Sequence, residues 1–189
     1  MEPRLTVQDL ACRRGDRLLF RGLSFSLGAS QALQVAGANG TGKSSLLRIL
    51  AGLLRPFGGR VDRAGPVALL DGNLPLDEHL PLGQSLAFWG RIDGVNEALD
   101  PGLNTLFDVP VRFLSTGQRK RAAIAQSHPR EGGIWLLDEP LNGLDVLAAE
   151  RLQDQVGEYR AYGGIVVIAS HQPFVLPDGK RIDLAEFAA

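Results

Sequence analysis

Residues 37–45 combine glycine, lysine and hydroxyl side chains in a pattern that suits the binding of phosphate. The run Gly37-Ala38-Asn39-Gly40-Thr41-Gly42-Lys43-Ser44, here called the phosphate loop, fits the motif G-x4-G-K-[ST], and Ser45 follows it. Its glycines would let backbone N–H groups wrap around an anion, and the dipole of the following helix would strengthen the attraction. We expect Lys43 to neutralise the β- and γ-phosphates of a nucleotide and the Ser44 hydroxyl to ligate Mg²⁺.

Two adjacent carboxylates, Asp138 and Glu139, end a short apolar run that starts at Ile134. Successive side chains of a strand point to opposite sides, so the two carboxylates could take different tasks. Asp138 would hold Mg²⁺ through its water shell, and Glu139 would accept the proton of the water that attacks the γ-phosphate. Alone, the pair would be typical of an exposed strand end, but the phosphate loop upstream favours catalysis.

A third motif, Ser115-Thr116-Gly117-Gln118, predicts the start of a helix. Ser115 is a good N-cap, and Gly117 leaves the backbone open to a ligand. Arg119, Lys120 and Arg121 follow in the first turn, where cations oppose the helix dipole unless an anion lies nearby. An ordinary capped helix with a solvated basic turn is the alternative interpretation.

The elements that must position these residues alternate between short apolar runs and helical patterns, which predicts an α/β fold with a parallel sheet. Strands are expected over residues 5–10, 18–27 (with a candidate break at Arg21-Gly22), 31–36, 67–70, 134–138 and 165–169. A helix after the phosphate loop should end at Gly52 and Pro56 and contain Leu46, Leu47, Leu50, Leu53 and Leu54. A second helical stripe consists of Ala148, Leu152, Val156 and Tyr159.

The segment 73–113 is rich in proline and glycine and predicts a small helical lobe. We therefore expect one domain over residues 1–189, in which residues 1–72 and 114–189 form a nucleotide-binding core. The apolar residues of the lobe could form its own core, or a groove that receives a short helix of a membrane subunit.

Composition excludes several other classes of protein. With 44% hydrophobic residues among 189, the chain can build a core and is not disordered. Its single cysteine, Cys12, excludes a disulfide framework and is expected to be a packed residue, while His79 and His128 are expected at the surface. A net charge of −1 gives no field that would attract nucleic acid, so no nucleic-acid partner is expected. No apolar run is long enough to span a bilayer, so any membrane role must come through a partner.

The sequence resembles the ATPase domain of ABC transporters in the order and spacing of its motifs. These are the phosphate loop, the segments 114–118, 136–140 and 141–145, and His171. The resemblance implies a P-loop NTPase with a RecA-like core sheet, an N-terminal antiparallel β part and a helical lobe, and it implies ATP and Mg²⁺ as cofactors. It also implies two copies packed head to tail. The signature residues Ser115, Thr116, Gly117 and Gln118 of one copy would then close over the γ-phosphate held by Lys43 of the other.

The same resemblance assigns roles to four further positions. Asp145 would lie at the interface between the copies, and His171 would contact the γ-phosphate. Arg14 stands where the family usually places an aromatic residue against adenine, and a guanidinium can also stack on a base. Asn73 stands where the family has a glutamine that senses Mg²⁺ and the attacking water. Thr116 replaces the usual glycine of the signature.

Residues 18–25, 111–118 and 163–173 are similar, more narrowly, to the ATPase subunits of the haem exporters of cytochrome c biogenesis. That similarity implies integral membrane partner subunits, a position at the cytoplasmic face of the bacterial inner membrane, and export or release of haem. The alternatives are an ATPase of a transporter with another substrate, a soluble ABC ATPase of a nucleic-acid machine, and a module that binds nucleotide without hydrolysis. A GTPase is disfavoured because the guanine-binding motif Asn-Lys-x-Asp requires a lysine after an asparagine, and the sequence has none. A small-molecule kinase is disfavoured because its reaction does not require the helix that begins at residues 115–118.

Overall fold

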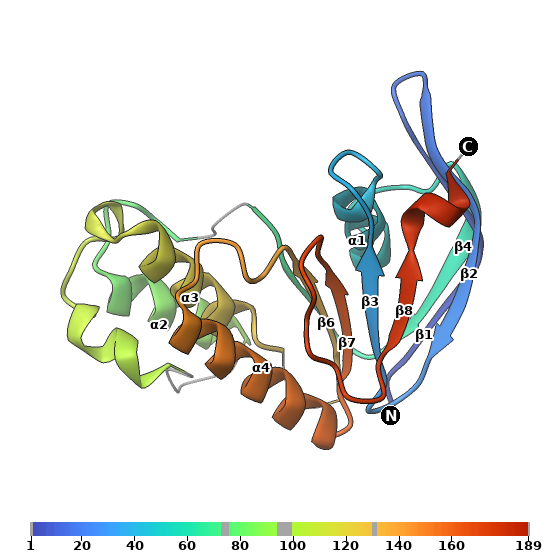
Figure 1. Cartoon of the computed structure of the whole chain (residues 1–189). Helices are drawn as coiled ribbons and strands as arrows, with labels where there is room; N and C mark the ends of the chain where they lie inside the picture. The colour runs from blue at the N-terminus through green and yellow to red at the C-terminus, as the bar shows by residue number, and fades with distance from the viewer. Residues whose placement is uncertain (1, 73–75, 94–99, 130–131, 189) are drawn as a thin grey trace.

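Two β-sheets with one helix packed between them form the larger part of the molecule (Figure 1). The computed structural model describes residues 2–72, 76–93, 100–129 and 132–188. The antiparallel sheet has the strand order β2-β1-β4, and the parallel sheet has the order β5-β6-β7-β3-β8. The strands are β1 (Arg4–Arg14), β2 (Arg17–Leu27), β3 (Ala32–Ala36), β4 (Gly58–Ala64), β5 (Val67–Leu70), β6 (Ile134–Asp138), β7 (Ile165–Ala169) and β8 (Lys180–Asp183).

Helices cover both faces of the parallel sheet. Helix α1 fills the space between the two sheets, whereas α3 and α4 pack on the opposite face. The helices are α1 (Lys43–Ala51), α2 (Leu82–Asp93), α3 (Thr116–Ser127) and α4 (Val146–Ala161), with the short 3₁₀ helices η1 (Pro101–Leu106), η2 (Val111–Phe113) and η3 (Leu184–Phe187). Among the described residues, no helix is long and apolar enough to cross a bilayer.

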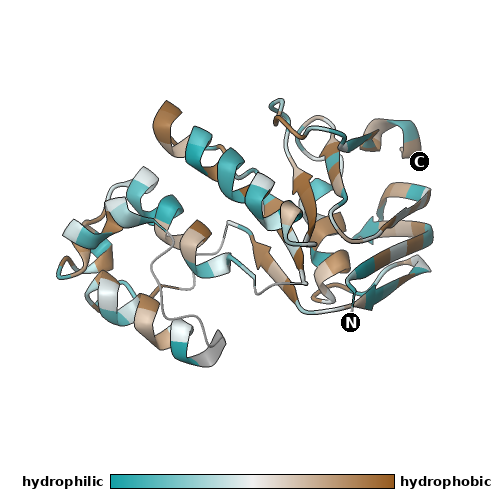
Figure 2. Ribbon diagram, turned by 90° about the horizontal axis from the view of Figure 1, so that it is seen from below, coloured by the Kyte–Doolittle hydropathy of each residue, from teal (hydrophilic) through white to brown (hydrophobic). Residues whose placement is uncertain are grey.

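The central strands of the parallel sheet are buried because helix α1 and the antiparallel sheet cover one face and helices α3 and α4 cover the other. Strands β3 and β7 are buried at every position, as is typical of a covered parallel sheet. Figure 2 shows these strands as hydrophobic, whereas the strands of the antiparallel sheet alternate between hydrophobic and hydrophilic residues. The α/β fold expected from the sequence is confirmed, and so are the strands at 67–70, 134–138 and 165–169.

Two local predictions are wrong. Helix α1 ends at Ala51 because Gly52 adopts a left-handed conformation (φ +81°), so Leu53 and Leu54 lie outside the helix and Leu53 is 71% exposed. Strand β2 is continuous through Arg21-Gly22, and irregular pairing with β1 absorbs the positive φ of Gly22.

The lobe has a hydrophobic core of its own, which includes Leu82 of α2 and Leu103 of η1. This core extends beyond Phe113, because Leu114 and Ala122 also belong to it. Helix α3 therefore packs against the lobe on one side and, through Ala123 and Ile124, against the parallel sheet on the other.

The expectation that His128 lies at the surface is wrong. Its ring is half-buried, with its centroid 4.8 Å from that of Trp135 and 5.4 Å from that of Tyr159. Burial lowers the pKa of His128, so the neutral imidazole is favoured. His79 is exposed and Cys12 is buried, as expected.

Candidate nucleotide-binding site

The phosphate loop joins β3 to α1, at the end of the parallel sheet where the carboxyl ends of its strands meet (Figure 1). Gly37, Gly40 and Gly42 have φ values of +143°, +83° and +107°, which residues with a side chain rarely adopt. A Cβ atom on Gly42 would also lie 3.2 to 3.3 Å from side-chain atoms of Phe20 and Leu19. The glycines are therefore required both for the curvature of the loop and for its packing on β2.

Lys43 begins α1 and turns back over the loop. Its Nζ donates to the carbonyl oxygens of Gly37 (2.8 Å) and Ala38 (3.2 Å), and its side chain is only 6% exposed. Ala38, Asn39, Gly40 and Ser44 are exposed, and the first turn of α1 contains no acidic residue. The loop thus presents a buried cation and the positive end of a helix dipole to an incoming anion.

Asp138 ends β6 and lies beside the first turn of α1. The Ser44 side chain forms a hydrogen bond with the carboxyl group of Asp138. The Oδ1 atom of Asp138, by contrast, is buried with no hydrogen-bond partner among the described residues. Burial is the main cause of a raised pKa of Asp138, which the Ser44 bond only partly opposes. A buried oxygen without a partner, next to a serine hydroxyl, is the donor set that a hard divalent cation prefers. These residues fit Mg²⁺.

Glu139 follows β6 directly. Its φ of +45° lies in the left-handed region, so Glu139 is outside the regular alternation of the strand that ends at Asp138. Its Oε2 lies 2.9 Å from Nδ1 of His171, and its Oε1 lies 3.4 Å from Nζ of Lys43. The backbone N–H of His171 also donates to Oε1 (3.2 Å). Three residues predicted from separate parts of the sequence therefore meet around one carboxylate.

The signature residues form the N-terminus of α3. Ser115 Oγ accepts from the N–H of Gln118 (3.2 Å), and Gln118 Oε1 accepts from the N–H of Ser115 (2.8 Å), which together make a capping box. Ser115 and Thr116 are exposed. A Cβ atom on Gly117 would lie 2.9 Å from the carbonyl oxygen of Gly143, so Gly117 also allows α3 to approach the segment 141–145.

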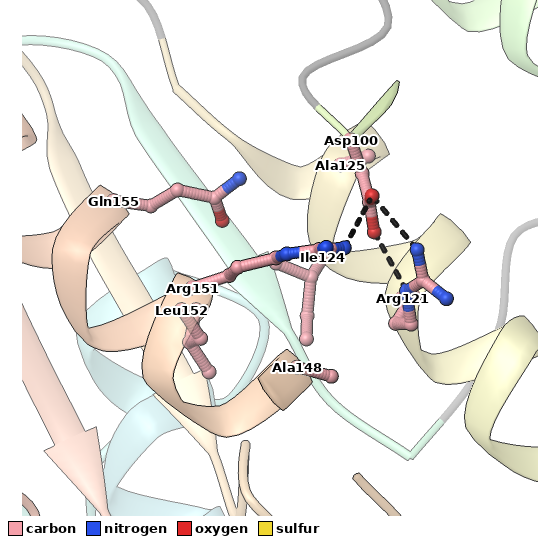
Figure 3. Close-up of a pocket in the computed structure, with 8 residues that line it drawn as sticks. All are labelled: Asp100, Arg121, Ile124, Ala125, Ala148, Arg151, Leu152 and Gln155. Atoms are coloured by element: carbon pink, nitrogen blue, oxygen red, sulfur yellow. Dashed lines mark hydrogen bonds and ion pairs between the residues drawn. The ribbon is translucent and has the colours of Figure 1, made fainter. Parts of the chain in front are cut away.

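The basic turn of α3 has nearby anions, contrary to the alternative of a solvated turn. Arg119 pairs with Glu78 (3.1 Å). Arg121 makes two bonds to Asp100, of 2.7 and 2.8 Å, and Figure 3 shows Arg151 of α4 reaching the same carboxylate. Lys120 donates to the main-chain oxygen of Glu139 (3.2 Å). The sequence indicated that these cations need a nearby anion, but their partners could not be predicted from it.

The other predicted positions lie around this centre. Arg14 is exposed at the end of β1, where the β1–β2 hairpin reaches the same end of the parallel sheet as the phosphate loop (Figure 1). Its neighbour Arg13 lies over the ring of Phe57, 4.6 Å from the centroid. Asp145 is exposed and caps α4 by accepting from the N–H of Ala148 (2.8 Å). Asn73 lies outside the described residues.

A glycine-rich loop between strand and helix, with its lysine and two carboxylates at the carboxyl end of a parallel sheet, defines a P-loop nucleotide-binding protein. Comparison with known families narrows the class, because residues 20–142 match the family described as ABC transporter. The chain belongs to the ABC transporter family, and it is an ATP-binding protein and ATPase of that family.

Individual relatives agree with this assignment. The cytochrome c biogenesis ATP-binding export protein CcmA of Novosphingobium aromaticivorans is 57% identical over 97% of this chain and 96% of its own length. The protein of the same name in Sphingopyxis alaskensis is 51% identical, with 92% and 93% covered. A solved ABC transporter ATP-binding protein of Pyrococcus furiosus superposes with a TM-score of 0.84 over 98% of this chain and 100% of that chain. At 20% identity, this last likeness shows the shared fold.

Proposed function

We propose that two copies of this chain hydrolyse Mg²⁺-ATP between them and drive a membrane transporter that serves cytochrome c biogenesis. The observation that supports the catalytic part is that Lys43 Nζ and His171 Nδ1 both contact the Glu139 carboxylate, at 3.4 and 2.9 Å, at one end of the parallel sheet. The names of the relatives support the transport process, and haem is the cargo expected from the sequence resemblance.

Phosphate binding would replace contacts that Lys43 makes in this structure. Its Nζ holds two loop carbonyls and the Glu139 carboxylate, and the β- and γ-phosphates offer the same ammonium group a stronger anion. The exposed N–H groups of the loop would hold the remaining phosphate oxygens. Lys43 would then be free to neutralise the phosphates as they separate.

Glu139 would act as the general base. Its carboxylate lies against Lys43 on one side and His171 on the other, so a water placed between it and the γ-phosphate could pass its proton to Glu139. His171 would orient this carboxylate and contact the γ-phosphate. Ser44 and Asp138 would hold Mg²⁺, which when bound supplies charge neutralisation for the phosphates. Catalysis would therefore depend mainly on position and charge.

The second copy would complete the site. Ser115 and Thr116 are exposed at the positive end of α3, and the capping box keeps this end ordered while leaving the Ser115 hydroxyl proton available to a phosphate oxygen. Asp145, Val146 and Leu147 are exposed beside it, the last two at 73% and 65%. These residues would lie at the interface between the copies.

Substitution of Lys43 and Glu139 tests this proposal. Lys43→Ala should abolish measurable ATP affinity in a fluorescence binding assay, because the loop loses its cation. Glu139→Gln should keep ATP affinity, lower kcat by about 100-fold or more, and give an ATP-dependent dimer in light scattering. Glu150→Gln, a matched change on the exposed face of α4, should hydrolyse ATP like the parent. Parent-like hydrolysis by Glu139→Gln would contradict the assignment of the base.

A further inference from the structure

The main chain of Glu139 adopts a conformation that needs external support. Among the described residues, four non-glycine residues have positive φ, and Glu139 is the one that belongs to the nucleotide site. The left-handed region is unfavourable for a residue with a Cβ atom, so its persistence in a site depends on contacts that hold it. The direction of the Glu139 side chain follows from this backbone conformation.

Three hydrogen bonds hold the main chain of Glu139. Its N–H donates to the carbonyl oxygen of Ala169 at the end of β7 (2.8 Å), and its own carbonyl oxygen accepts from Nζ of Lys120 (3.2 Å) and from the N–H of Asn142 in the turn that follows (3.3 Å). The first bond ties the residue to the sheet that also positions His171. The second ties it to α3, the helix whose N-terminus consists of the signature residues.

We infer that Lys120 is a positioning residue, which holds the Glu139 carboxylate in its catalytic direction through the Glu139 main chain and so links the signature helix to the general base. This inference rests on the proposed role of Glu139. Lys120 does not need to touch ATP or water. Lys120 is half-buried, and its ammonium group lies near the carboxylates of Asp71, Asp138 and Glu139. These negative charges offset the cost of burying its positive charge.

The hydrogen bond from Lys120 to Glu139 would give α3 a second function, besides presenting the signature residues to the other copy. When the signature residues close over a nucleotide on the other copy, any movement of α3 changes the distance between Lys120 Nζ and the Glu139 carbonyl oxygen. The contact of Gly117 with the Gly143 carbonyl oxygen joins the same helix to the segment that follows Glu139. A base that is oriented by the signature helix would be correctly placed when that helix is in position.

A double-mutant cycle in the full chain tests the inference. Lys120→Met removes the donor and keeps the chain length, so kcat for ATP should fall by about 10-fold or more while KM changes by less than about 3-fold. Lys120→Arg, which keeps a charged donor, should recover most of kcat. Lys180→Met is the matched control, because it removes a lysine bond to a main-chain oxygen, that of Ser26, and Lys180 pairs with Leu33 near the start of β3, whereas the phosphate loop follows the end of β3.

Adding Lys120→Met to a variant that lacks the Glu139 carboxylate distinguishes a positioning role of Lys120 from a purely structural one. In Glu139→Ala, the residual single-turnover rate should change by less than about 2-fold when Lys120→Met is added. An equal fall in both backgrounds, or parent-like kcat for Lys120→Met, would overturn the inference. If Lys120→Met does not fold, Lys120→Gln, whose amide nitrogen falls one bond short, should lower kcat in the same way. Failure of the proposed function would show separately, as parent-like hydrolysis by Glu139→Gln alone.

Discussion

The Glu139 carboxylate occupies the position in which Lys43 and His171 could otherwise hold a phosphate. Both partners contact it directly, at 3.4 and 2.9 Å. In the proposed mechanism, a bound nucleotide would displace one of these contacts, because the γ-phosphate and the Glu139 carboxylate would share the same two partners.

His128 illustrates a different balance at the residue scale. Its ring packs against those of Trp135 and Tyr159, and its Nδ1 lies 3.1 Å from the carbonyl oxygen of Pro129. Because burial lowers the pKa of His128, protonation favours the unfolded chain, and the stabilisation that is present above the ordinary histidine pKa is lost as the pH falls through the folded-state value.

We therefore expect the free energy of unfolding to fall between about pH 7.5 and pH 5.5, measured by urea denaturation. His128→Phe keeps an aromatic ring that cannot be protonated, so this variant should lose less stability over the same range. His79→Gln, a change at an exposed histidine, should follow the parent. Identical pH dependence of His128→Phe and the parent would show that His128 does not contribute.

At the scale of elements, helix α3 connects the catalytic centre to the lobe. Asp100, 10% exposed, precedes η1 and accepts two bonds from Arg121 of α3, while Arg151 of α4 lies 3.6 Å away (Figure 3). Asp100 also caps η1 by accepting from the N–H of Gly102 (3.0 Å). One carboxylate thus ties together three elements, and Arg121 holds the pKa of Asp100 below its ordinary value.

Asp100→Asn should destabilise the chain by about 2 kcal/mol, because it leaves Arg121 without its charged partner. Chemical denaturation measures this loss. The parent should lose the same contribution as the pH falls below the ordinary aspartate pKa, since the folded state keeps the carboxylate ionised. Asp62→Asn breaks the exposed pair with Arg60 and should cost less than about 0.5 kcal/mol. Equal losses for the two variants would contradict the structural role of Asp100.

The elements that the sequence predicted well are those whose signal is local. The apolar runs at 67–70, 134–138 and 165–169 became parallel strands, and the last two are buried because both of their faces are covered. Strands β4 and β8 were not predicted, since both are edge strands with mostly polar side chains, whose pairing depends on the neighbouring strand.

The candidate site shows the same limit. Residue types and spacing pointed to the phosphate loop and the two carboxylates, because each belongs to a short motif, whereas His171 was inferred from the family resemblance. The left-handed backbone of Glu139, the bond from Lys120 and the pairing of Arg121 with Asp100 depend on segments that meet only in the folded chain. These long-range contacts leave no periodic pattern in the sequence.

At the scale of the whole molecule, the nucleotide site lies at one end of the parallel sheet and the lobe lies beyond α3 (Figure 1). The lobe has exposed apolar side chains, among them Phe88 at 50% and Phe113 at 67%, which its own core does not cover. An ATP-driven movement of α3 would be passed to this lobe through the Asp100 and Glu78 ion pairs. The proposed membrane subunits would receive that movement.

The central claim is that ATP binding to paired copies of this chain drives membrane subunits of cytochrome c biogenesis. Capture from detergent-solubilised native membranes, with tagged Glu139→Gln and Mg²⁺-ATP, tests this claim most directly. We predict recovery of multi-span proteins of cytochrome c biogenesis, with the same complex captured by the parent. Recovery of other permeases alone would contradict the cytochrome c assignment, and recovery of only ribosomal or DNA-bound material would contradict the membrane role.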